Sequence, residues 1–164
     1  MKSSNRFALL ATVVVALSSL SSAAMAASAT GTANAQVLAP IAITAGTALN
    51  FGTIAGNGAG TVIVTPGGAR SFTGGVVGTA AAFAAGTFNV TGTGGATFAM
   101  TYPGSFNVSA NAGANTMAVT VNGAATGTLS GGTASFPVGG TLTVGAAQAA
   151  GAYTGTYSMT VEYN

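Results

Sequence analysis

Very few side chains in this sequence could take part in acid–base, nucleophilic or metal chemistry. There is no histidine and no cysteine, and the one acidic residue is Glu162. General acid–base catalysis needs a positioned group with a tuned pKa, and an activated nucleophile needs a base beside it. The many serine and threonine hydroxyls have no such partner, and a lone carboxylate cannot form a metal cage. We therefore expect no enzyme, no metal site and no cofactor site.

The N-terminus has the pattern of a secretory signal peptide. Lys2 and Arg6 precede an apolar run at 7–17, and Ala24-Met25-Ala26 provides the small-residue cleavage site. The apolar run is shorter than the roughly 20 residues that a membrane span needs. We expect residues 1–26 to be removed and the protein to be secreted, through the periplasm to the cell surface or beyond it.

Cleavage leaves Arg70 and Glu162 as the only charged side chains. One arginine cannot neutralise the several phosphates on which nucleic-acid affinity depends, so we expect no nucleic-acid partner. Chains near zero net charge tend to associate, which favours self-association. The two charges could form an ion pair that fixes the register between two strands or two subunits, or be two solvated surface residues. We favour the second reading, because exposed pairs contribute only about 0–1 kcal/mol.

Short alternating runs separated by glycine-rich punctuation follow one another after residue 33. Their spacing of about 8–12 residues predicts an all-β sandwich or barrel. Glycine clusters at 56–60 and 92–95 predict turns. The expected strands are 35–44, 48–54, 60–65, 87–91, 97–102, 105–109, 116–122, 134–138, 140–144 and 153–163.

The last of these runs shows the clearest alternation. One face carries Tyr153, Gly155, Tyr157, Met159, Val161 and Tyr163, and the other carries threonine, serine and Glu162. The tyrosine row could stack against a ligand, but its common face with Met159 and Val161 favours core packing. A strand at the end of the sequence must pair with earlier parts of its own chain or with another molecule.

Two stretches carry a resemblance to known families. Residues 36–44 followed by 48–54 resemble the opening of secreted bacterial β-sandwich proteins. Gly151, fourteenth from the C-terminus, and the penultimate Tyr163 resemble the C-terminal signature of chaperone–usher fimbrial subunits. With the stretch 142–146, the chain looks most like the family called domain of unknown function 4402, which is similar to spore coat protein U and archaic pilins.

The resemblance implies an immunoglobulin-like antiparallel β-sandwich that lacks one strand. In such subunits a periplasmic chaperone and then the N-terminal extension of another subunit supply that strand, with the help of an usher. Applied to this sequence, it implies an extension at 27–34 and one domain at 35–164. The last strand, with Gly151 and the residues Tyr153, Tyr157, Met159, Val161 and Tyr163, would border the empty position. The candidate donor residues are Ala29, Gly31, Ala33, Ala35 and Val37.

Two departures from the archaic pilins stand out. They usually carry a cysteine near the position of Pro40, and this chain has none. The candidate donor segment is also mostly alanine, and burial of each alanine methyl group contributes only about 0.8 kcal/mol.

The leading expectation is a non-enzymatic subunit of a bacterial surface fibre or coat. The alternative is a self-contained secreted β-sandwich that binds a glycan, a surface or ice. The alternative draws on threonine-rich faces such as Thr61, Ile63 and Thr65, although the sequence shows no regular threonine array.

Overall fold

The computed structural model describes residues 25–164. The chain divides into two units, Met1–Ala35 and Gln36–Asn164, and only residues 25–35 of the first unit are described. In the first unit, the described residues 25–35 form no helix or strand, and their side chains are exposed. The second unit contains all the strands given below. The predicted signal peptide lies outside the described residues except for Met25 and Ala26.

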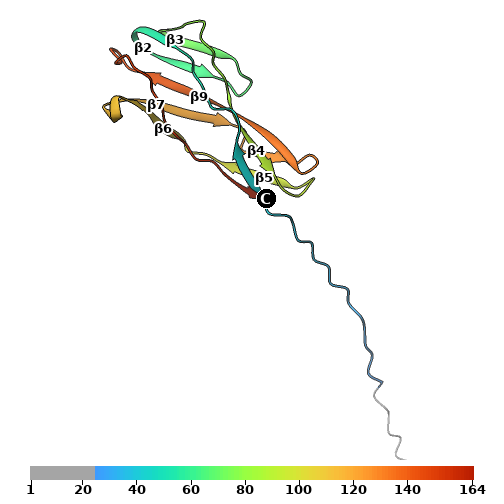
Figure 1. Cartoon of the computed structure of the whole chain (residues 1–164). Helices are drawn as coiled ribbons and strands as arrows, with labels where there is room; N and C mark the ends of the chain where they lie inside the picture. The colour runs from blue at the N-terminus through green and yellow to red at the C-terminus, as the bar shows by residue number, and fades with distance from the viewer. Residues whose placement is uncertain (1–24) are drawn as a thin grey trace, which may run out of the picture. The chain divides into compact units, whose positions relative to one another are not determined.

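Ten strands and one 3-10 turn make up the unit Gln36–Asn164 (Figure 1). No α-helix occurs in the described residues. That part of the chain therefore contains no helix long and apolar enough to cross a bilayer. The bounds are β1 Ala42–Ala45, β2 Ile54–Val64, β3 Arg70–Gly78, β4 Gly86–Thr91, β5 Thr97–Thr101, β6 Ser105–Ala110, η1 Asn111–Gly113, β7 Asn115–Gly123, β8 Thr126–Thr128, β9 Thr133–Val144 and β10 Thr160–Tyr163.

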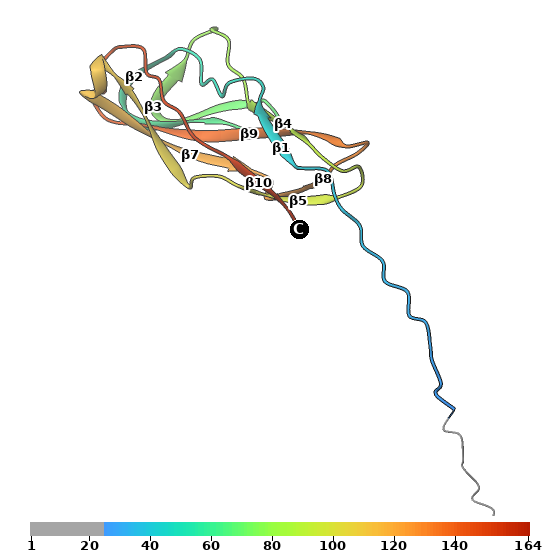
Figure 2. The same cartoon turned by 60° about the horizontal axis from the view of Figure 1, so that its bottom comes forward.

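The strands form two antiparallel sheets. The larger sheet has the order β1-β4-β9-β2-β3. β4 and β2 pair with successive parts of one edge of β9, and β7 pairs with the other edge. β6 pairs with β7. The smaller sheet has the order β10-β5-β8. Figure 2 shows β5, β8 and β10 as a layer below β1, β4 and β9. The predicted all-β sandwich is confirmed.

Alternation of small apolar and hydroxyl residues explains why these segments form strands. In β7, Met117, Val119 and Val121 are buried, and the residues between them are exposed. This period of two places every apolar side chain on one face of the pleated strand. β9 is the central strand of the larger sheet and pairs with β2, β4 and β7.

Two clusters of buried side chains lie in the sandwich. The closed-half core draws on both sheets and consists of Val90, Phe98, Met100, Val121, Leu129, Phe136, Val138 and Met159. The buried residues of the open-half core all come from strands of the larger sheet. They are Val62, Val76, Met117, Val119, Leu142 and Val144.

The end of the chain is paired over a shorter length than the alternation predicts. β10 begins only at Thr160. Of the residues 153–159 that precede it in the predicted strand, only Thr154 forms a bridge, and its partner is Ser109. Together with the register of Thr160 opposite Thr101, this bridge places 155–159 opposite 102–108. Pro103 in that stretch has no N–H to donate to a ladder. The prediction of one continuous strand at 153–163 is therefore wrong.

Other sequence predictions also fail locally. Residues 48–53 contain one isolated bridge in place of a strand, and Ile54 already begins β2. The strand predicted at 35–44 begins only at Ala42. The turn predicted at 56–60 lies inside β2, which has a bulge between Gly56 and Gly60. β3 and β8 were not expected. The alternation of β3 is interrupted by two glycines, of which Gly74 has a positive φ of 67°.

Candidate functional site

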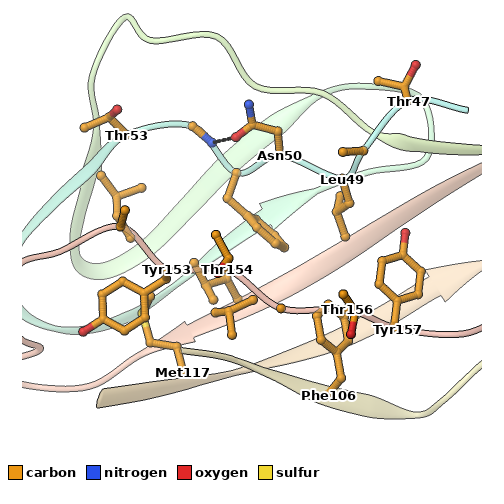
Figure 3. A pocket seen from close by; sticks show the side chains of 18 of the residues that line it. Thr47, Leu49, Asn50, Thr53, Phe106, Met117, Tyr153, Thr154, Thr156 and Tyr157 are labelled. Carbon is orange, nitrogen blue, oxygen red and sulfur yellow. Dashed lines mark hydrogen bonds between the residues drawn. The ribbon is translucent and has the colours of Figure 1, made fainter. Parts of the chain in front are cut away.

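A groove lies over the open-half core, between the stretches 45–54 and 151–157 (Figure 3). Both stretches are irregular, apart from Ala45 at the end of β1 and Ile54 at the start of β2. The groove has a volume of about 820 Å³. We call the two stretches its first wall and its second wall. The floor consists of apolar side chains from β4, β6, β7 and β9, namely Phe88, Phe106, Val108, Met117 and Leu142.

The first wall is held by hydrogen bonds along one side. Asn50 exchanges both of its backbone hydrogen bonds with Ala84. The side-chain carbonyl of Asn50 accepts a hydrogen bond from the Gly52 amide at 2.8 Å, and Gly52 has a φ of 76°. This Asx-type turn ends the extended run, because only glycine adopts that φ without strain. The backbone groups of Ala48 and Leu49 have no hydrogen-bond partner among the described residues.

The second wall has an unpaired backbone over a longer stretch. Thr154 exchanges hydrogen bonds with Ser109, and the Asn164 amide donates to Thr97 of β5. Between Thr154 and β10, residues 155–159 have no backbone hydrogen bond to any described residue. Successive residues of an extended chain direct their backbone groups to opposite edges. Because Thr154 bonds to β6 and Asn164 bonds to β5, an extended chain between them directs the N–H and C=O groups of its odd-numbered residues to the other edge.

Both walls therefore offer unpaired backbone groups beside an apolar floor. Buried or half-buried N–H and C=O groups need partners, and an open strand edge is a template for another strand. The groove can bind an extended peptide by main-chain hydrogen bonds, with alternate side chains of that peptide facing the floor. It contains no acid, base or nucleophile with an activating partner.

Tyr153 and Tyr157 lie at opposite ends of the second wall, as Figure 3 shows. The Tyr153 hydroxyl donates to the Ala149 carbonyl and accepts from the Gln148 side-chain amide, both at 2.7 Å. The Tyr157 hydroxyl has no hydrogen bond to a described residue. Its ring stacks on Phe106 at 4.9 Å between centroids and meets the ring of Phe88 edge-on at 5.8 Å. Burial raises the pKa of the Tyr157 phenol.

Tyr163 fastens three distant parts of the chain. Its hydroxyl accepts a hydrogen bond from the Thr93 amide and donates one to the Ala39 carbonyl, each at 2.8 Å. The Ala39 amide in turn donates to the Thr93 hydroxyl at 2.7 Å. We call this arrangement the Tyr163 clasp. It joins the end of β10 to the beginning of the second unit and to the turn after β4.

The remaining residues of the predicted last strand have packing roles. Met159 is buried in the closed-half core, and Val161 packs against it. Gly151 and Gly155 lie against β6. A Cβ atom on Gly155 would sit 2.5 Å from the Asn107 carbonyl oxygen, so no larger residue fits there without movement.

The candidate donor residues have no strand partner. Ala29, Gly31, Ala33 and Ala35 belong to the first unit and are exposed. Val37 lies at the beginning of the second unit with 94% of its side chain exposed. None of the residues 25–41 lies in a strand.

Arg70 is not the solvated surface charge that we expected. Its guanidinium donates to the Phe51 carbonyl at 3.0 Å and to the Thr79 carbonyl at 2.8 Å. It also lies over the rings of Phe72 and Phe83, at 5.0 and 4.2 Å from their centroids. This arginine fixes the first wall to β3 and to the loop after it. No single feature of the sequence near Arg70 identifies these partners.

Glu162 is exposed, and it forms no ion pair with Arg70. The prediction of a solvated surface side chain is confirmed for Glu162 and is wrong for Arg70. Neither charge lines the groove.

A second surface covers the outer side of β3, β2, β9, β7 and β6, and we call it the hydroxyl face. Strand pairing places Thr61 beside both Thr73 and Thr143, and Thr141 beside Thr120. This cross-strand array is absent from the sequence pattern, because it depends on register. The face has no charged or aromatic side chain and consists of Thr61, Ile63, Ser71, Thr73, Ser105, Asn107, Ser109, Thr116, Ala118, Thr120, Asn122, Thr141 and Thr143.

Comparison with known proteins supports one assignment. Neither the curated proteins nor the solved structures include a match to this chain. A family model described as "Domain of unknown function (DUF4402)" matches residues 41–163, which include every strand and both walls of the groove. The chain therefore belongs to the DUF4402 family.

Proposed function

We propose that this protein is a non-enzymatic structural subunit of a bacterial surface fibre or coat, and that its groove binds a β-strand from a second copy. One observation carries the proposal: unpaired backbone groups on both walls flank an apolar floor that the smaller sheet leaves uncovered. In this reading the domain is an immunoglobulin-like sandwich that lacks one strand.

The proposed occupant is the segment 29–37 of a neighbouring copy. It alternates small apolar residues with threonine, asparagine and glutamine, as a strand with one buried face does. The seven residues of the second wall span about 23 Å at about 3.3 Å per residue, and the nine residues of the donor segment exceed that length. Neither the segment nor the groove lining contains a charged residue, so no charge loses its hydration on binding.

Main-chain hydrogen bonds supply most of the affinity in this arrangement. Each alanine methyl adds about 0.8 kcal/mol on burial, and each hydrogen bond about 0.5–1.5 kcal/mol. Many bonds along the two walls are needed, which matches the length of unpaired backbone. A strand donated head to tail leaves each new subunit with its own open groove, so growth yields a fibre.

Secretion and a dedicated escort belong to the same proposal. An open groove with an apolar floor invites unspecific strand pairing. A periplasmic chaperone that covers it until assembly, and an usher that exchanges subunits, would prevent this. Other pilin-like subunits could take the place of an identical copy.

The experiment compares the mature chain with a variant that lacks residues 27–38. We expect the mature chain to form concentration-dependent oligomers or filaments in sedimentation velocity and electron microscopy, and the shortened variant to remain monomeric. A synthetic peptide of residues 27–39 should bind the shortened variant in a one-to-one complex.

A peptide of the same composition with the alternation scrambled is the matched control, and it should not bind. Assembly that persists unchanged after the deletion would refute the proposal. So would a shortened variant that is folded by circular dichroism but binds neither peptide.

A second candidate function follows from the hydroxyl face. Its threonines repeat at about 4.7–4.9 Å across strands and about 6.6 Å along them, an array suited to ordered water. The absence of aromatic side chains from this face makes ice a better candidate than a glycan. Thermal hysteresis of the mature chain should disappear in the double variant Thr61→Lys/Thr143→Lys. Absence of hysteresis in the unsubstituted chain would remove this candidate.

A further inference from the structure

We infer that Tyr157 limits the groove to strands with small side chains, which makes it the residue that determines partner specificity. The inference rests on the proposed function, because it concerns the strand bound in the same groove. It explains why an alanine- and glycine-rich donor is suited to an acceptor whose floor consists of large apolar residues.

The ring of Tyr157 crosses the groove at one end. It starts from the second wall, stacks on Phe106 and contacts Phe88, and in Figure 3 it lies across from Leu49 of the first wall. A Cβ atom added to Gly86 of β4 would lie 2.9 Å from the Tyr157 hydroxyl oxygen and 3.3 Å from the Leu49 Cβ. The groove at this level has no room for even one more methyl group on its β4 side.

Neither wall can retreat to make room. The second wall lies against β6, since a Cβ atom on Gly155 would meet the Asn107 carbonyl oxygen at 2.5 Å. The first wall is held from behind by the hydrogen bond from Arg70 to the Phe51 carbonyl. A large side chain of the incoming strand would therefore have to displace the Tyr157 ring, and with it two aromatic contacts.

The donor segment fits this restriction. Of its five inward residues only Val37, at one end, is larger than alanine. The Tyr157 hydroxyl also offers a hydrogen-bond donor to the bound strand. The hydroxyls of Tyr102, Tyr153 and Tyr163 all bond to described residues, whereas that of Tyr157 does not.

The test enlarges the donor and the groove separately and together, in the complete mature chain. Ala29, Gly31, Ala33 and Ala35 are each changed to Leu, alone and combined with Tyr157→Ala. Sedimentation velocity gives the concentration of half-assembly. At one or more positions we expect Leu to raise this concentration at least about tenfold, a change of about 1.4 kcal/mol. Tyr157→Ala should reverse the increase at that position.

Tyr157→Phe is the matched control, because it keeps the ring and removes only the hydroxyl. It should not rescue any Leu variant. If Tyr157→Ala does not fold, Tyr157→Leu provides a smaller enlargement with the same expected direction. The inference is overturned if all four Leu variants assemble like the unsubstituted chain, or if no groove variant rescues them. Failure of the proposed function looks different, because deletion of residues 27–38 would then leave assembly unchanged.

Discussion

The closed and open halves of the sandwich contain similar residues and differ in how their last layer is completed. In the closed half, side chains from both sheets meet, and Phe98, Leu129 and Val138 have no exposed area. In the open half, the buried residues come from the larger sheet, and partly buried side chains such as Leu49 and Tyr153 cover them. The second wall and β10 belong to one alternating stretch, yet only β10 has a continuous ladder.

This difference indicates that alternation of apolar side chains is not enough to pair a strand into a sandwich. The odd-numbered residues of 153–163 turn toward the cores over the full length of the stretch, but their backbone needs partners as well. In the closed half β5 provides those partners. In the open half only Thr154 is paired, with Ser109 of β6, and residues 155–159 have no backbone partner among the described residues.

The largest expected effect breaks the closed half. Phe98→Ala should lower the free energy of unfolding by about 3–5 kcal/mol, because Phe98 is fully buried and its removal leaves a cavity. Leu49→Ala in the open half is the matched variant. It should cost only about 1 kcal/mol, because the Leu49 side chain is partly buried. Urea denaturation of both variants measures the contrast, and equal losses would contradict it.

The next effect concerns Arg70, which supports the open half from outside its core. Arg70→Met should cost about 2–3 kcal/mol, because two carbonyl groups lose a charged hydrogen-bond donor and two rings lose a cation. Glu162→Gln should change stability by less than about 0.5 kcal/mol, because that side chain is exposed and unpaired. A comparable loss in both variants would indicate an ion pair that the structure does not contain.

A smaller effect tests the Tyr163 clasp at the closed end. Tyr163→Phe should cost about 1 kcal/mol, because the Thr93 amide and the Ala39 carbonyl each lose a partner. Hydrogen exchange at the Thr93 amide should become faster, while amides of β7 stay protected. Unchanged exchange at Thr93 would show that water replaces the hydroxyl without loss.

The smallest effect is the pH dependence that Tyr157 contributes. Burial raises its pKa, so the folded protein holds this proton more firmly than the unfolded chain, where tyrosine ionises near about 10. The contribution of Tyr157 to the free energy of unfolding is fully present below about pH 10, and it is lost as the pH rises through the pKa of Tyr157 in the folded protein. Urea denaturation on both sides of that pH should show a decline that Tyr157→Phe reduces. An identical decline in the variant would assign it to other groups.

Much of the fold follows from local pattern. Alternation located β5, β6 and β7 within a residue or two, because burial on one face of a strand is a property of neighbouring residues. The separate strands expected at 134–138 and 140–144 are one strand, β9. Gly139 alone separates the two predicted runs, and the strand continues through it.

The candidate site could be predicted only in part. The alternation of 153–163 pointed to the stretch that contains the second wall, but its missing ladder depends on residues 102–108 opposite it, which are far away in the sequence. The contacts of Arg70 with Phe72 and Phe83 likewise depend on tertiary structure. The hydroxyl face depends on register between strands, which no single strand encodes.

The Tyr163 clasp has a mechanical consequence in a fibre of the proposed kind. Tension would enter each subunit at the beginning of its folded unit, where the clasp lies, and leave through the groove walls that grip the next donor strand. The load then runs lengthwise along 153–163 and its neighbours. Hydrogen bonds perpendicular to the strands are loaded in shear, so they must break together and not one after another. A chain without disulfides could thereby resist pulling.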